Sequence, residues 1–85
     1  MNDDALRRAT EVKERHVAQL LSKANVLSVG VGFRQRGGRV TDEVVLVVNV
    51  TRKLPPDQLR PEDVVPRTIE GIPVDVYETG VLRAL

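Results

Sequence analysis

The 85-residue chain has no cysteine and no tryptophan, and it has one histidine, one tyrosine and one phenylalanine. Without cysteine the protein forms no disulfide bond and no thiolate metal site. A single histidine, His16, is too few for a zinc site built from imidazoles. The core must therefore come from valine, leucine, isoleucine and alanine. Because a chain of this length buries only about 60–65% of its unfolded surface, we expect association with another surface to add to its stability.

The charges are nearly balanced, with 13 basic and 12 acidic residues and a formal net charge of +1. This balance provides no overall attraction to nucleic acid or to an anionic membrane. No apolar run approaches the roughly 20 residues that span a bilayer. The amino-terminal sequence MNDDALRR is acidic where a signal peptide would be basic. We therefore expect a cytoplasmic protein without a membrane partner, and nucleic acid is a disfavoured partner.

A helix is predicted for residues 3–24, because apolar residues recur there at spacings of three and four and form one broad stripe. The stripe consists of Leu6, Ala9, Val12, Val17, Leu20, Leu21 and Ala24. Asn2 or Asp3 is suited to cap the first turn. Asn25 is suited to the left-handed conformation that often ends a helix.

Three strands are predicted after the helix, at residues 26–34, 43–51 and 72–78. The polar stretch around the Gly-Gly pair between the first two predicts a flexible loop of several residues rather than a two-residue turn. The proline-containing segment 55–71 predicts an irregular crossover with short helical turns. This order predicts an α+β fold, in which residues 1–85 form one domain with the N-terminal helix packed on a small three-stranded sheet. Whether this domain is a whole protein or the N-terminal domain of a longer one stays open. The partner of the third strand and its direction stay open.

The second predicted strand is apolar from Val44 to Val50 except at Asn49. A strand that is apolar on both faces is typical of a sheet covered on both sides, and a single helix covers only one side. On the first strand two glycines share a face, so that either another backbone approaches closely or the strand bends there. We therefore predict a surface for a partner that is formed by Gly30, Gly32, Val45 and Val47.

Three arginines, Arg34, Arg36 and Arg39, surround the loop between the first two strands. A basic loop is able to contact phosphate or an acidic partner, so these residues are a candidate anion contact. A solvated loop is the competing interpretation, because the net charge is near zero and no aromatic side chains accompany the arginines to stack on bases.

The sequence shows no pattern that predicts catalysis, a cofactor or a metal. His16 has no partnered nucleophile, and we interpret it as a boundary residue with a hydrogen-bond partner. Ser22 and Ser28 lie outside any G-x-S-x-G segment. The glycines of V-G-V-G-F lack the third glycine and the following helix of a dinucleotide site. The acids between residues 57 and 70 lack the spacing of a calcium loop, and we interpret them as solvated residues and helix caps. We expect a protein that is not an enzyme and has no cofactor.

Three ordered segments carry a resemblance to a known family. They are V-G-V-G-F at Val29–Phe33, a segment containing E-V-V-L-V-V-N-V and K-L-P at residues 43–55, and V-P-R-T-I-E-G-I-P-V-D-V-Y-E-T-G at Val65–Gly80. Together they resemble the N-terminal region that precedes the protease domain in bacterial trypsin-like serine peptidases, including relatives of the plant narrow-leaf-type peptidases. The resemblance implies an accessory domain beside a protease. It transfers no catalytic residue to this chain, which lacks the protease domain itself.

The sequence therefore predicts an accessory or interaction domain, which packs on a linked or neighbouring protease domain or self-associates as a homo-oligomer. Two alternatives stay open. The chain is a propeptide-like folding aid or inhibitor whose residues 77–85 enter a protease cleft, or its basic loop makes a weak contact with nucleic acid.

Overall fold

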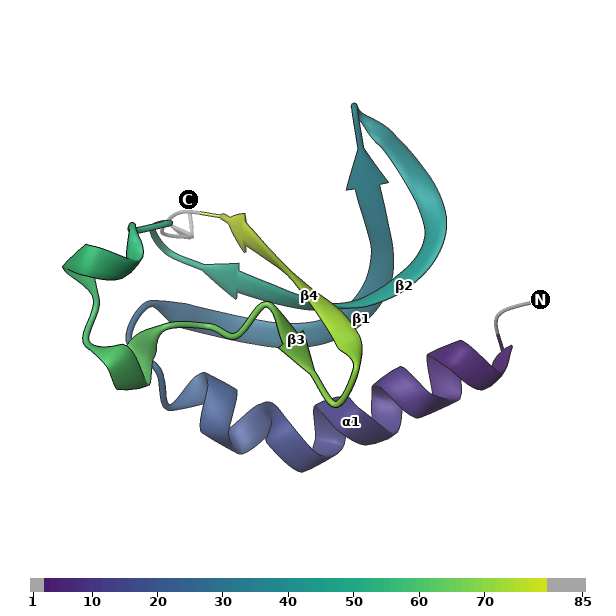
Figure 1. Ribbon diagram of the computed structural model, residues 1–85, viewed down its shortest axis with the longest axis horizontal. Helices are drawn as coiled ribbons and strands as arrows, with labels where there is room; N and C mark the ends of the chain where they lie inside the picture. Colours follow the sequence, from purple (N-terminus) through teal and green to yellow (C-terminus); the bar gives the residue numbers. More distant parts are fainter. Residues whose placement is uncertain (1–2, 80–85) are drawn as a thin grey trace, which may run out of the picture.

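The structure is a computed structural model that describes residues 3–79. Its helix and strands are α1 (Asp3–Leu21), β1 (Val26–Arg36), β2 (Arg39–Val50), β3 (Thr68–Ile69) and β4 (Ile72–Glu78). Two 3-10 turns, η1 (Pro56–Gln58) and η2 (Pro61–Asp63), lie in the crossover between β2 and β3 (Figure 1). The predicted α+β class is confirmed.

Helix α1 ends at Leu21 and not at residue 24 as predicted. The N–H of Lys23 donates to the carbonyl of Leu20 at 3.1 Å, which tightens the last turn. Asn25 follows with a φ of 72°, so its predicted left-handed conformation is confirmed. The alternative cap Asn2 lies outside the described residues. No helix within residues 3–79 is long and apolar enough to cross a membrane.

The sheet has four strands, in the order β1-β2-β4-β3, where the sequence predicted three. The β1–β2 and β3–β4 pairs are antiparallel, whereas β2 and β4 are parallel, which answers the question of the last strand's partner. The additional strand β3 is joined to β4 by a tight turn in which Glu70 and Gly71 have φ values of 50° and 80°. A strand of two residues is too short to show the alternation by which a sequence predicts a strand.

The connection between β1 and β2 corrects the predicted loop of several residues. Arg36 pairs directly with Arg39, so the turn consists only of Gly37–Gly38. These glycines have φ values of 55° and 78°, the left-handed conformation that a type I′ turn requires. The ladder is irregular between Phe33 and Gln35. Beyond that point the hairpin bends away from α1 (Figure 1).

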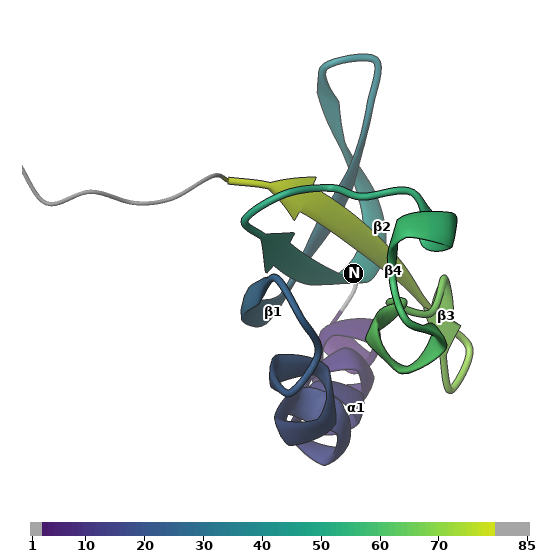
Figure 2. The same cartoon turned by 90° about the vertical axis from the view of Figure 1, so that its left-hand side faces the viewer.

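The core lies between α1 and one face of the sheet. Its fully buried side chains include Val12 and Leu20 of α1 and Leu46 and Val48 of β2. Figure 2 shows α1 on one side of the sheet and the β1–β2 hairpin rising on the other side. Among the described residues, the second side of the sheet carries no helix.

Candidate interaction surface

The sheet face opposite α1, which we call the open face, is the candidate functional site. Leu46 and Val48 point into the core, and alternate residues of a strand point to opposite faces. Residues that are paired in the ladder share a face. The open face therefore contains Ser28, Gly30 and Gly32 of β1, Val45, Val47 and Asn49 of β2, and Asp75 and Tyr77 of β4.

Two glycines form the floor of the open face, and the space above them differs. A Cβ atom added to Gly30 would meet no other heavy atom within 4 Å. A Cβ atom added to Gly32 would lie 3.1 Å from Cγ2 of Val47. Neither glycine has a positive φ, so the backbone conformation does not require glycine. The sequence left two explanations for the glycines, a close approach by another backbone or a bend of the strand. In the described part of this chain, no backbone approaches Gly30 closely. The floor is open to another molecule.

One of the predicted partner residues, Val45, is inaccessible, because its exposed fraction is 0%. Arg34 of β1 reaches Asp75 of β4, and its Nη2 lies 3.1 Å from Oδ1 of the carboxylate. Since β2 lies between β1 and β4, this ion pair crosses β2 near Val45 on the open face. Gly30, Gly32 and Val47 are partly exposed. They are the part of the predicted surface that a partner is able to reach.

The three predicted anion-binding arginines lie on the hairpin arms next to the turn, but two of them already face a carboxylate. Oε1 of Glu43 lies 3.4 Å from Nη1 of Arg34 and 3.8 Å from Nη2 of Arg36. Hydrogen bonding to Asp75 raises the pKa of Arg34 above its ordinary value. Arg39 is exposed beside the turn. The carboxylates offset the positive charge that an anion would contact, so the geometry weakens the predicted anion contact.

A charged cluster that the sequence analysis did not find joins the β3–β4 turn to α1. Arg15 donates two hydrogen bonds to the Glu70 carboxylate, at 3.0 and 2.8 Å, and Nε2 of His16 lies 2.8 Å from the same group. Arg8 donates to the carbonyl oxygen of Glu70 at 3.0 Å. The hydrogen bonds of Arg15 and, after it, His16 to the carboxylate lower the pKa of Glu70 to about 2. His16 therefore has the predicted partner, and the cluster attaches the hairpin to the helix.

Asp63 corrects the prediction that the acids of the crossover are solvated, because only 7% of this residue is exposed. Its carboxylate accepts hydrogen bonds from the backbone N–H of Ala24 at 2.9 Å and from Nε of Arg60 at 3.2 Å. The bond from Ala24 is the main cause that lowers the pKa of Asp63. Asp63 thus fixes the crossover to the end of α1. In residues 3–79 no group of three or more histidine, aspartate or glutamate side chains is placed to hold a metal ion.

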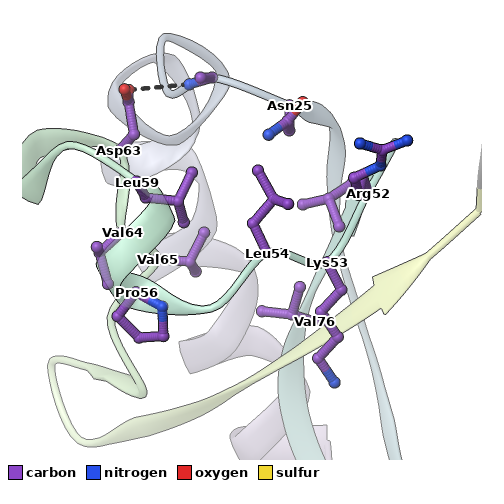
Figure 3. A pocket seen from close by; sticks show the side chains of 12 residues that line it. Asn25, Arg52, Lys53, Leu54, Pro56, Leu59, Asp63, Val64, Val65 and Val76 are labelled. Carbon is purple, nitrogen blue, oxygen red and sulfur yellow. Dashed lines mark hydrogen bonds between the residues drawn. The ribbon is translucent and has the colours of Figure 1, made fainter.

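An apolar pocket of about 140 Å³ lies between the crossover and the ends of β2 and β4 (Figure 3). Its aliphatic lining includes Val50, Leu54, Leu59, Val64, Val65 and Val76, and Arg52 and Lys53 lie beside them. Val50 belongs to the core on the helix side of the sheet, and Val76 packs against that core. The pocket is therefore separate from the open face.

Comparison with known families gives a match over nearly the whole of the described chain. The family model described as the NARROW LEAF 1 N-terminal domain matches residues 5–79. The matched region runs from the first turn of α1 to the end of β4 and includes the whole open face. Comparison with curated proteins gives no match. The family description names a domain and its position, and it names no activity.

Proposed function

This chain belongs to the NARROW LEAF 1 N-terminal domain family, and from that premise we propose that it is a non-catalytic accessory domain that binds another protein through the open face. One observation carries the proposal. The central strand β2 is apolar on both sides, and α1 covers only the side of Leu46 and Val48. No described segment lies over Gly30 on the other side. Packing against a second surface would remove this apolar floor from water.

We assign the partner to a trypsin-like serine peptidase domain on the same polypeptide or beside it. The motifs at residues 29–33, 43–55 and 65–80 support this assignment, because they resemble the region that precedes such a domain. The composition of the open face also supports it. Polar groups flank the glycine floor, with a 2.9 Å hydrogen bond from Asn49 to Ser28 on one side and the Arg34–Asp75 ion pair on the other. Interfaces between domains are typically more polar than obligate subunit interfaces.

Two matched substitutions test the proposal. Gly30→Glu places a carboxylate in the open face, where a side chain has room. Ala18→Glu places the same group on an exposed position of α1. Sedimentation velocity then measures binding to a trypsin-like catalytic domain of a family member. We expect the wild-type chain and Ala18→Glu to bind, and Gly30→Glu not to bind.

Three results distinguish the partners. Equal binding by both variants would contradict a role for the open face. Self-association of the wild-type chain from micromolar to millimolar concentration, lost in Gly30→Glu, would make a second copy the partner in place of the peptidase. If the wild-type chain stays monomeric and binds no peptidase domain, the result would contradict the proposed function.

The other functions considered from the sequence have less support. The folding-aid or inhibitor hypothesis depends on residues 77–85, of which residues 80–85 lie outside the described residues. Nucleic-acid binding depends on Arg34, Arg36 and Arg39, and Glu43 lies within ion-pair distance of the first two. The absence of enzymatic activity stays a prediction.

A further inference from the structure

The outer edge of β4, on the side away from β2, is paired only at its beginning. β3 pairs with Ile72 and Pro73, and the N–H of Val74 donates to the carbonyl of Arg67 at 2.9 Å. Successive residues of a strand direct their N–H and C=O groups alternately to the two sides, so Val76 also directs its groups outward. In the described part of the chain no strand pairs with Val76 on that side. This segment therefore has the properties of an open sheet edge.

A groove of about 600 Å³ lies over β4 on the open face and borders this edge. Residues Val74–Tyr77 line it along β4, and Arg34 and Arg36 line it from the β1 arm. Arg67 lines it beside Val74, to which it is hydrogen-bonded. Lys53 lines it at the other end of β4, where its backbone N–H donates to Oε1 of the Glu78 side chain at 2.7 Å. The groove thus extends along the edge from Arg67 to Lys53.

The two ends of the groove are positively charged. Within residues 3–79 neither Arg67 nor Lys53 forms an ion pair, in contrast to Arg34 and Arg36. Arg67 lies beside Val74 and Lys53 beside Glu78. Val74 and Glu78 are four residues apart on β4, and a strand rises about 3.3 Å per residue, so the two ends of the groove are about 13 Å apart along the strand. A strand of five residues covers the same distance.

The apolar pocket opens beside the same edge. Val76 and Lys53 line both the pocket and the groove. Figure 3 shows the Val76 side chain among those of the pocket, with Leu54 and Val65 of the crossover beyond it. An extended chain at this edge would therefore meet positive charge at the two ends of the groove, at Arg67 and Lys53, and aliphatic side chains in the pocket.

We propose that the open edge of β4 binds an extended peptide segment of a partner protein, in which carboxylate and apolar side chains alternate. The segment adds to the sheet as a further strand, hydrogen-bonded to Val76. Its alternate side chains point to opposite faces, so the carboxylates reach Arg67 and Lys53 while the apolar side chains reach the pocket. Charge complementarity thus selects an acidic segment. The groove shares Arg34, Asp75 and Tyr77 with the open face, but the inference does not rest on the Gly30 floor, and its tests concern Arg67 and Val76.

Binding of a synthetic probe tests the charge requirement. The probe is the fluorescent peptide Glu-Leu-Glu-Val-Glu with blocked ends, titrated with the 85-residue chain while polarisation is measured. We expect binding that weakens with salt, a several-fold loss in Arg67→Glu, and no change in the matched control Arg7→Glu, which is exposed on α1. Binding of Lys-Leu-Lys-Val-Lys with equal affinity, or an equal loss in both variants, would overturn the proposal.

Methylation of the peptide's backbone nitrogens tests strand addition without altering the protein. Alternate residues of an added strand donate to the sheet, so two peptides are compared, one methylated at the odd positions and one at the even positions. We expect one to lose binding and the other to keep it. Equal behaviour of the two peptides would contradict pairing with the edge.

Hydrogen exchange at the Val76 amide identifies the occupant of the edge. We expect rapid exchange in the free chain and slow exchange after the acidic peptide is added. Slow exchange before addition would show that residues 80–85 of the same chain or a second copy already pair with the edge, and it would overturn the proposal.

Discussion

Replacement of Gly30 by alanine tests whether the stability of the isolated domain requires a glycine at this position, separately from any requirement of a binding partner. The added Cβ would meet no heavy atom within 4 Å, and Gly30 does not have a positive φ. Glycine inside a strand costs roughly 0.5–1 kcal/mol relative to alanine, because it loses more backbone freedom on folding. Gly30→Ala should therefore increase the free energy of unfolding of the isolated domain by about 0.5–1 kcal/mol, which corresponds to a rise of about 2–8 °C in Tm.

Urea and thermal unfolding followed by circular dichroism measure this change, with two other glycines as controls. Gly32→Ala should gain less, because its Cβ would lie 3.1 Å from the Val47 side chain. Gly71→Ala should lose about 1–2 kcal/mol, because Gly71 has a φ of 80°. A loss of stability in Gly30→Ala would contradict this expectation. It would mean that the chain itself requires the space above Gly30 and that the floor is not open.

Three further predictions follow from the core, the charged cluster and the hairpin. Leu46→Ala should lower the free energy of unfolding by about 2–5 kcal/mol, because Leu46 is fully buried, whereas Leu27→Ala on the surface should change it by less than about 0.5 kcal/mol; urea titration measures both. Glu70→Gln should lower Tm at neutral pH. Because the pKa of Glu70 is lowered from 4.5 to about 2, the stabilisation is complete above about pH 4.5 and is lost as the pH falls toward 2. The two melting temperatures should therefore converge in acid, and a constant difference would contradict the cluster. Gly38→Val should destabilise the domain by about 1–2 kcal/mol, because Gly38 has a φ of 78°, and an unchanged Tm would contradict the two-residue turn.

The helix and the three longer strands were predictable because their apolar residues follow regular spacings. Asn25 was predictable as well, since asparagine tolerates the left-handed conformation. The extent of the hairpin was not predicted, because the residues around its turn are mainly polar and lack the alternation of a half-buried strand. The Gly37–Gly38 pair was the available signal, since both positions of a type I′ turn have positive φ.

The contacts between distant segments could not be read from the sequence. Glu70 lies 62, 55 and 54 residues from Arg8, Arg15 and His16, and no local pattern relates them. Val45 is likewise buried where an ion pair between the two neighbouring strands, Arg34–Asp75, crosses β2. The open face was predicted in part, because its glycines and valines alternate along two strands. Which of these residues remain accessible required the structure.

Chemical-shift mapping tests most directly whether the open face is the interaction surface. The isotope-labelled chain is titrated with the peptidase domain, and its backbone amide signals are followed residue by residue. We expect shifted or broadened signals for Ser28, Gly30, Gly32 and Val47, while the signals on the exposed side of α1 stay unchanged. Changes confined to α1, with the amides of β1 unaffected at saturation, would contradict the open face as the interaction surface.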